Sequence, residues 1–136
     1  MEKSTEIRDF VLSSYKSMLD GDVLFGEHHM SQRGDVLVIG TDPNEWWEGY
    51  ETVLEVLKPQ VEALAGSVLE GDPQAYVEGS VGWFADNVQW KLPSGAVLAA
   101  RLTGVCHKEG GDWKIVQWHW SIGVPNEEAF GQDLTT

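Results

Sequence analysis

The sequence is poor in cysteine, because Cys106 is the only one among its 136 residues. A single cysteine excludes a disulfide within the chain. Cys106 ends a largely apolar run that begins at Leu102, and a buried cysteine in such a run packs as a small hydrophobic side chain. A catalytic thiol would need exposure and a basic partner, so we predict that Cys106 is structural.

Basic residues are also scarce, since 9 Lys and Arg stand against 22 Asp and Glu and give a net charge of −13. A surface this acidic repels nucleic acid and anionic membranes. The charge keeps the protein soluble, and it could bias a binding site toward neutral or cationic ligands. Long apolar runs and a signal-peptide core are missing as well. We therefore expect a cytoplasmic protein that has neither nucleic acid nor a membrane as a partner.

Motifs for cofactor chemistry are missing too. The sequence has no glycine-rich phosphate loop, no Walker pattern and no nucleophilic serine elbow. His28 and His29 are adjacent, but neighbouring residues of a regular element point apart, and no further ligand stands at a suitable spacing. We predict neither a metal nor a cofactor.

The sequence is nevertheless rich in core-forming residues, with seven Trp and 42% hydrophobic residues. This composition excludes disorder, and the length suits a single domain over residues 1–136 with a polar tail from about residue 125. Apolar residues at helical spacing from Ile7 to Leu19 predict a first helix, which Ser4 or Thr5 can cap and Gly21 can end. Residues 22–33 are ambiguous, with room for one helical turn around Val23 to Phe25.

A second helix is predicted after a short strand at Val36–Ile39. The run Asp42-Pro43-Asn44-Glu45 has the order of a capping box with proline at the first helical position. A helical pattern of apolar residues then continues from Trp46 to Leu64, and Gly66 can stop it. Pro59 should kink this helix or split it after about Leu57.

The second half of the chain predicts strands. They are expected at Val68–Leu69, Ala75–Ala85, Val88–Leu92, Ala96–Cys106 and Trp113–Val124. Tight glycine-containing and proline-containing turns separate them, which favours antiparallel hairpins. Helices followed by antiparallel strands define the α+β class. Helices can cover one face of such a sheet, so the other face is solvated or covered by a second subunit, and we predict a homodimer.

The last predicted strand has two different faces. Alternation places Val116, Trp118, Trp120 and Ile122 on an apolar face. The opposite face carries Ile115, Gln117, His119, Ser121 and Gly123.

Several of these segments resemble a known family. The matching segments are residues 40–49 (Gly-Thr-Asp-Pro-Asn-Glu-Trp-Trp-Glu-Gly), 82–83, 93–95, 101–103 and 112–127. Together they are similar to the SnoaL-like branch of the nuclear-transport-factor-2-like superfamily, also called the cystatin-like cone fold. The last strand also resembles the association domain of calcium/calmodulin-dependent protein kinases. The resemblance covers nearly the whole chain.

The resemblance implies a cone-shaped α+β fold, with N-terminal helices on a strongly curved antiparallel sheet that encloses a pocket. The open face of the sheet would serve dimerisation. Members of the superfamily include isomerases, polyketide cyclases, dehydratases, binding proteins and assembly modules, so the fold alone does not fix the activity. The enzymes typically place an Asp, sometimes with a His or Tyr, in the pocket as acid or base.

Two residues are candidates for acid–base work. Asp86 follows Trp83-Phe84-Ala85, and an apolar surrounding raises the pKa of a carboxylic acid; the alternative is a loop or bulge that faces water. His119 can act as an imidazole acid or base. It lies opposite Trp118 and Trp120 by parity, so the alternative is a hydrogen-bonding role in a dimer interface.

A polar network and an aromatic pocket complete the predicted site. Arg101 and Thr103 share a face, and they could lie near His119 or Ser121 to bind an anionic group or to form, with Gln117, part of a subunit interface. Large aromatic residues could line an apolar cavity, although each could equally belong to the core. The predicted ligand-binding residues are Tyr15, Trp46, Trp47, Tyr50, Trp83, Trp118 and Trp120.

Two functions follow from these candidates. The first is an isomerase, cyclase or dehydratase that acts on a small apolar or aromatic molecule. The second is a non-catalytic ligand-binding or dimeric assembly module. A charged side chain that reaches a cavity would favour the first.

Overall fold

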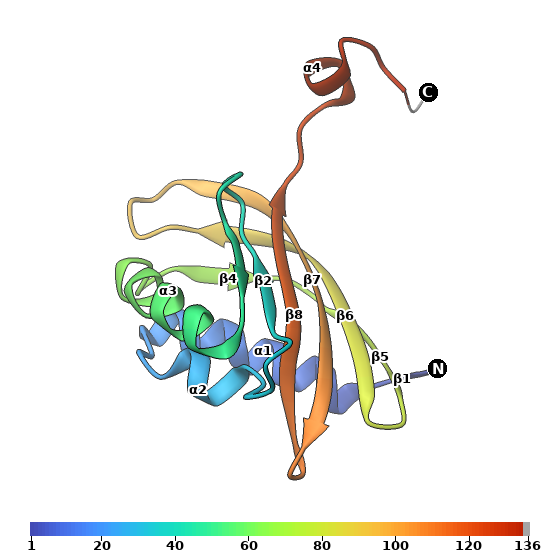
Figure 1. The fold of residues 1–136 in the computed structure, drawn as a ribbon. Helices are drawn as coiled ribbons and strands as arrows, with labels where there is room; N and C mark the ends of the chain where they lie inside the picture. Colours follow the sequence, from blue (N-terminus) through green and yellow to red (C-terminus); the bar gives the residue numbers. More distant parts are fainter. Residues whose placement is uncertain (135–136) are drawn as a thin grey trace.

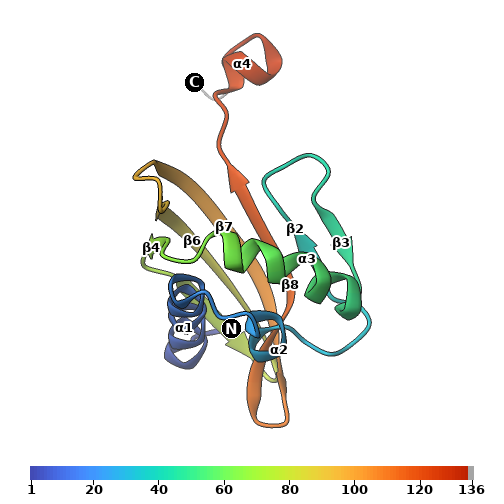
Figure 2. The same cartoon turned by 90° about the vertical axis from the view of Figure 1, so that its left-hand side faces the viewer.

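The computed structural model describes residues 1–134 as one curved sheet with helices packed on one of its faces (Figures 1 and 2). The predicted α+β class is therefore confirmed. The helices are α1 (Thr5–Asp20), α2 (Phe25–His29), α3 (Tyr50–Ala63) and α4 (Asn126–Phe130). The strands are β1 (Glu2–Lys3), β2 (Leu37–Ile39), β3 (Trp46–Glu48), β4 (Val68–Glu70), β5 (Gln74–Glu78), β6 (Val81–Lys91), β7 (Val97–Glu109) and β8 (Asp112–Ile122).

The sheet runs in the order β1-β5-β6-β7-β8-β2-β3, and β4 also pairs with β6. The pairs are antiparallel except for β2 and β8, which are parallel. The expected strand over residues 75–85 is wrong, because the chain turns at Gly79, whose φ is +63°. β5 therefore ends at Glu78, and β6 runs without a break across the two strands that were expected on either side of Asn87.

Helix α1 confirms the first predicted helix and its caps. The Ser4 hydroxyl accepts a hydrogen bond from the Ile7 N–H at 3.0 Å. Gly21 ends the helix with φ at +65°, a left-handed conformation that glycine adopts without a steric penalty. The buried stripe of α1 includes Ile7, Val11 and Tyr15 and faces the sheet.

The second helix starts later than predicted. Asp42 and Glu45 do form local hydrogen bonds, since the Asp42 N–H donates to Glu45 Oε1 at 2.8 Å and the Asn44 N–H donates to Asp42 Oδ1 at 2.9 Å. These bonds close a turn between β2 and β3, because Trp46–Glu48 pairs with β2 instead of entering a helix. The helix begins at Tyr50 and runs through Pro59 to Ala63, so the predicted split after Leu57 does not occur.

A β-bulge in β8 changes the predicted faces of the last strand. Gln117 pairs with Val105 while Ile115 pairs with Cys106, so Val116 has no partner of its own on β7. The extra residue brings Ile115 to the buried side. Ile115 was expected on the opposite face, so that part of the prediction is wrong.

The two faces of the sheet differ in their cover. We call one the helix-covered face, and it carries Phe84, Asp86, Val88, Leu102, Trp118 and Trp120. The other is the open face, over which neither view shows a helix (Figures 1 and 2). It carries Trp83, Ala85, Arg101, Thr103, Val105, Gln117, His119 and Ser121.

The polar tail extends away from the sheet beyond the end of β8 (Figure 1). It contains the short helix α4, which the sequence analysis did not predict, and none of the residues of α4 is buried.

Candidate functional site

Asp86 lies in the middle of β6, between Phe84 and Val88 on the helix-covered face. It pairs with Leu102 of β7 in unbroken register. The alternative that Asp86 occupies a loop or a bulge is therefore wrong.

A gap in strand pairing opens next to Asp86. β5 pairs with β6 as far as Ala85, and β4 pairs with it only from Gln89 onward. The turn Gly71-Asp72-Pro73 bridges this gap, and the Asp72 N–H donates to Asp86 Oδ1 at 3.1 Å. Gly71 is required there, because a Cβ at this position would lie only 2.8 Å from Asp86 Cγ.

Tyr15 holds the other oxygen of the Asp86 carboxylate. Its hydroxyl donates to Asp86 Oδ2 at 2.6 Å, the short distance that is typical of a hydroxyl bonded to a charged oxygen. Tyr15 lies on the buried side of α1, and burial, together with the hydrogen bond to Asp86, raises the pKa of Tyr15 well above its usual value. Tyr15 therefore stays protonated and acts as a fixed donor.

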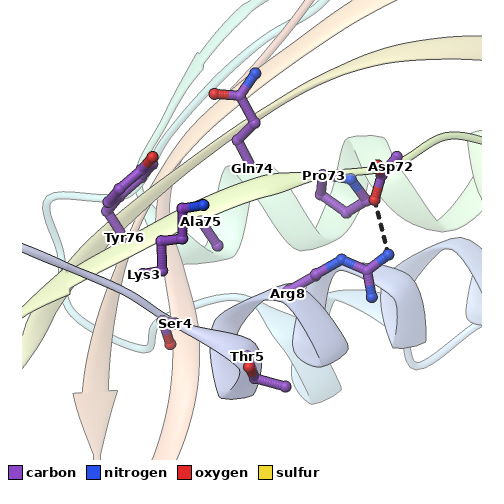
Figure 3. Close-up of a pocket in the computed structure, with 9 residues that line it drawn as sticks. All are labelled: Lys3, Ser4, Thr5, Arg8, Asp72, Pro73, Gln74, Ala75 and Tyr76. Carbon is purple, nitrogen blue, oxygen red and sulfur yellow. Dashed lines mark hydrogen bonds and ion pairs between the residues drawn. The ribbon is translucent and has the colours of Figure 1, made fainter.

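An ion pair supports the turn that covers Asp86. Figure 3 shows Arg8 of α1 reaching up to Asp72, and its Nη2 atom lies 2.8 Å from Asp72 Oδ1. Both side chains are largely exposed, so solvent screens the pair and it contributes little to stability. Its effect is to orient the turn whose N–H group binds Asp86.

A cleft of about 400 Å³ opens beside this carboxylate. This volume lies within the range of roughly 300–1,000 Å³ that small-molecule sites occupy. Arg101 and Thr103 of the neighbouring strand β7 also line this cleft, although they lie on the open face of the sheet. The residues that line it are Asp72, Gln74, Ala85, Asp86, Asn87, Arg101, Leu102 and Thr103.

The cleft can therefore support proton transfer. It presents the Asp86 carboxylate, and each of its two oxygens accepts one hydrogen bond from an uncharged donor. It also presents the Arg101 guanidinium, which makes no ion pair with any of residues 1–134. A carboxylate can accept a proton from a substrate, and a guanidinium can bind a carbonyl or anionic oxygen.

His119 belongs to a different part of the molecule. It lies on the open face and lines a hollow of about 270 Å³ with Trp46 and Ser121. His119 is not among the residues that line the cleft beside Asp86, and it lines a different hollow, so the two side chains do not share one site.

The predicted polar network does come together on the open face. Arg101 pairs with Ser121 and Thr103 pairs with His119 across β7 and β8. Gln117 follows on the same face, opposite Val105.

The seven predicted ligand-binding aromatics do not share one cavity. Trp118 and Trp120 are buried, with 3% and 5% of their surface exposed, and their ring centroids lie 5.7 Å apart. Trp118 also packs on Phe25 at 5.3 Å. Trp83 stacks on Tyr76 of β5 on the open face, with ring centroids 4.8 Å apart.

The remaining predicted aromatics are spread over other elements. Trp46 lies on β3 with 58% of its surface exposed. Trp47 and Tyr50 are partly buried and pack against the core. Tyr15 lies on α1 and hydrogen-bonds to Asp86.

Two site residues were missed in the sequence. Gly71 and Asp72 fall in one of the turns expected between strands, and nothing local shows that this turn folds over Asp86.

The side chains with other predicted roles also have clear environments. Cys106 is fully buried, and burial raises the pKa of its thiol to about 12, which agrees with a structural role. His28 Nδ1 lies 2.7 Å from Asp22 Oδ2. No cluster of three or more His, Cys, Asp or Glu side chains that could hold a metal is found in residues 1–134. No helix of the described part of the chain is long and apolar enough to span a membrane.

Comparison with known proteins identifies the family. A model of the SnoaL-like domain matches residues 7–125, so the chain belongs to the SnoaL-like domain family. No curated protein matches the sequence.

Solved structures with the same fold come from several bacteria. A candidate dehydratase of the nuclear transport factor 2-like family from Streptomyces avermitilis superposes with a TM-score of 0.76 at 14% identity, over 88% of this chain and 94% of its own. A candidate ketosteroid isomerase from Parabacteroides distasonis superposes with a TM-score of 0.70 at 23% identity, over 92% of this chain and 96% of its own. A candidate calcium/calmodulin-dependent protein kinase type II association domain from Thiobacillus denitrificans superposes with a TM-score of 0.71 at 13% identity, over 85% of this chain and 93% of its own. At these identities the likeness establishes the fold alone.

Proposed function

We propose that the protein is an acid–base enzyme of the isomerase, cyclase or dehydratase kind, with Asp86 as the proton-transfer group. The observation that carries this proposal is the Tyr15–Asp86 hydrogen bond at the unpaired edge of β6, beside the cleft. Similarity to a candidate dehydratase and a candidate ketosteroid isomerase supports it.

The substrate that suits this cleft is a small, largely apolar molecule with a carbonyl group. The Asp86 carboxylate removes a proton from the carbon next to the carbonyl, and the electron pair moves onto the carbonyl oxygen. Arg101 stabilises the negative charge that develops there. Asp86 then returns the proton to a second carbon of the isomer, or to a leaving hydroxyl group in a dehydration. Tyr15 keeps the carboxylate in one orientation throughout.

Exchange of the substrate's α-proton with solvent deuterium measures proton removal by Asp86, and it does not require that the product be known. Small cyclic ketones are incubated with the protein in D₂O, and loss of the α-proton signal is followed by NMR. We expect Asp86→Asn to slow exchange by 100-fold or more, because general bases contribute about 10²–10⁴-fold. Tyr15→Phe should slow it less, and Asp9→Asn, which alters an exposed acid on the same helix, should leave it unchanged. Exchange that is equal in the wild type and in Asp86→Asn would refute the assignment.

The open face supports the proposed homodimer. It is uncovered in the single chain, and it combines exposed apolar side chains such as Val105 with the polar network around His119 and Arg101. Burying apolar area between polar rim groups is how subunit interfaces form.

Val105→Glu should dissociate such a dimer, because it places a charge on the open face, which the second subunit would bury. Sedimentation velocity at micromolar concentration measures the outcome. Val68→Glu is the matched control, since Val68 is equally exposed (37% against 36%) but lies on β4. A wild-type monomer, or equal dissociation by both variants, would contradict this interface.

A further inference from the structure

A second hollow lies away from Asp86, between the β2–β3 hairpin, α3 and the rings of Trp90 and Trp120. Its volume is about 190 Å³. This is smaller than the roughly 300–1,000 Å³ of sites for drug-sized ligands, so it suits a head group and not a large ring system. We call it the Glu45–Trp slot after Glu45, Trp90 and Trp120, which line it together.

The carboxylate of Glu45 is held firmly at this slot. Its Oε1 accepts from the Asp42 N–H at 2.8 Å, and its Oε2 accepts from Gln60 Nε2 at 3.1 Å. Gly40 makes room for it, because a Cβ there would lie 2.8 Å from Glu45 Cδ. Three separate features of the chain therefore fix one carboxylate.

The charge of Glu45 is not neutralised by these contacts. Both donors are neutral, and Glu45 takes part in none of the ion pairs formed among residues 1–134. A partly buried carboxylate that is bonded only by neutral groups keeps its negative potential in the adjacent hollow.

The other wall of the slot is aromatic. Trp90 and Trp120 both line the slot, and they pack on each other with ring centroids 5.1 Å apart and planes inclined by 49°. The face of a tryptophan attracts a cation within about 6 Å of the ring centre. A cation in the slot would lie beside both indoles and in the field of Glu45.

We infer that the Glu45–Trp slot binds the quaternary trimethylammonium group of a small organic cation. Such a group donates no hydrogen bond, so it needs ring faces and a negative field and leaves the two donors on Glu45 in place. A bare Ca²⁺ would need about 6–8 oxygen ligands, and the slot offers one carboxylate. A neutral apolar group would desolvate that carboxylate without compensation. The net charge of −13 further concentrates cations around the protein.

Choline and its neutral isostere 3,3-dimethylbutan-1-ol test this inference in the wild-type protein. They have the same shape and differ in charge at one atom. Each is titrated into the protein at constant ionic strength while tryptophan fluorescence is recorded. We expect saturable quenching by choline and at least tenfold weaker binding of the alcohol. Equal binding of the two compounds, or no saturable response to choline, would overturn the inference.

Three variants locate the site. Glu45→Gln removes the charge and keeps the size of the side chain, and it should weaken choline binding at least tenfold. Trp90→Leu should abolish binding. Glu48→Gln is the matched control, because Glu48 lies on the same hairpin but outside the slot, where its carboxylate accepts a hydrogen bond from Trp46 Nε1. This variant should bind choline as the wild type does.

The slot does not depend on the proposed chemistry at Asp86. Asp86→Asn should therefore retain choline binding in full. Circular dichroism establishes that each variant is folded, and the comparison of the two probes in the wild type decides the question if Trp90→Leu does not fold. Choline binding that survives Glu45→Gln unchanged would place the cation elsewhere.

Discussion

Gly71→Ala tests whether the turn over Asp86 holds the carboxylate as the structure indicates. Gly71 has no positive φ, so alanine fits its backbone conformation. The strain comes only from the new Cβ, which would lie within 3.0 Å of both Cγ and Oδ1 of Asp86. Asp86 has a short side chain that is fixed by Tyr15 and Asp72, so it cannot move aside without losing these bonds.

The magnitude follows from the bonds that must break. A hydrogen bond to a charged group contributes about 1.5–3 kcal/mol, and the bond from the Asp72 N–H lies near the surface and contributes less. Overpacking alone costs about 1–3 kcal/mol. We therefore expect Gly71→Ala to lower the free energy of unfolding by about 2–3 kcal/mol. For a chain of this size the melting temperature should fall by roughly 6–12 °C.

A double-mutant cycle isolates the contact between Gly71 and Asp86. In an Asp86→Ala background the new Cβ has no carboxylate to meet, so Gly71→Ala should change stability by less than about 0.5 kcal/mol. It could even stabilise slightly, since alanine restricts the unfolded chain. The coupling energy between the two positions should be about 2–3 kcal/mol.

Urea unfolding followed by tryptophan fluorescence measures the four variants of the cycle at one protein concentration, because oligomerisation would shift apparent stability. Gly34→Ala is the control: Gly34 also lacks a positive φ, and a Cβ there would meet nothing within 4 Å. If Gly71→Ala costs the same with and without the Asp86 carboxylate, the turn does not pack on Asp86 as described.

Three further predictions concern stability. His29 is buried, and burial lowers its pKa below 6.5. Because the unfolded chain binds the proton more readily, stability should be full above about pH 6.5 and fall below it. His29→Gln should flatten this dependence of the urea midpoint on pH, and an unchanged dependence would contradict the prediction. Phe84→Ala should lower the free energy of unfolding by about 3–5 kcal/mol, because Phe84 is 1% exposed and its removal leaves a cavity; a cost below 1 kcal/mol in urea unfolding would contradict its place in the core. Ser4→Ala should cost about 0.5–2 kcal/mol through loss of the cap on α1, whereas Ser13→Ala on the exposed side of the same helix should change the melting temperature little.

Local signals explain why α1 was predicted correctly and why the start of the second helix was not. The cap at Ser4 and the end at Gly21 lie next to a helical pattern, and all three act within a few residues. The segment at Asp42 carries equally good local signals and forms their hydrogen bonds. Pairing of β3 with β2 then draws Trp46–Glu48 into the sheet, and tertiary contacts of this kind override helix propensity.

At the candidate site, the carboxylate could be predicted from neighbouring residues, but its hydrogen-bond partners could not. Asp86 stood out because a carboxylate interrupts an apolar run. The partners that determine its chemistry come from far along the chain: Tyr15 is 71 residues away and the Asp72 N–H is 14 residues away. No spacing rule links these positions, so the sequence could indicate the acid but not what holds it.

The bulge at Val116 shows how one unpaired residue decides the use of a whole strand. Strict alternation would put Ile115 with His119 on the open face, but the structure buries Ile115 with Trp118 and Trp120. Side chains on both sides of the bulge thereby serve one core, from Trp113 to Trp120, while Gln117, His119 and Ser121 all remain on the open face. Without the bulge, strict alternation would put Trp113 and Ile115 on the face opposite Trp118 and Trp120, so one of these two pairs would leave the core. The separation of an aromatic interior from a polar exterior along β8 therefore rests on this irregularity, and a period-two pattern cannot reveal it.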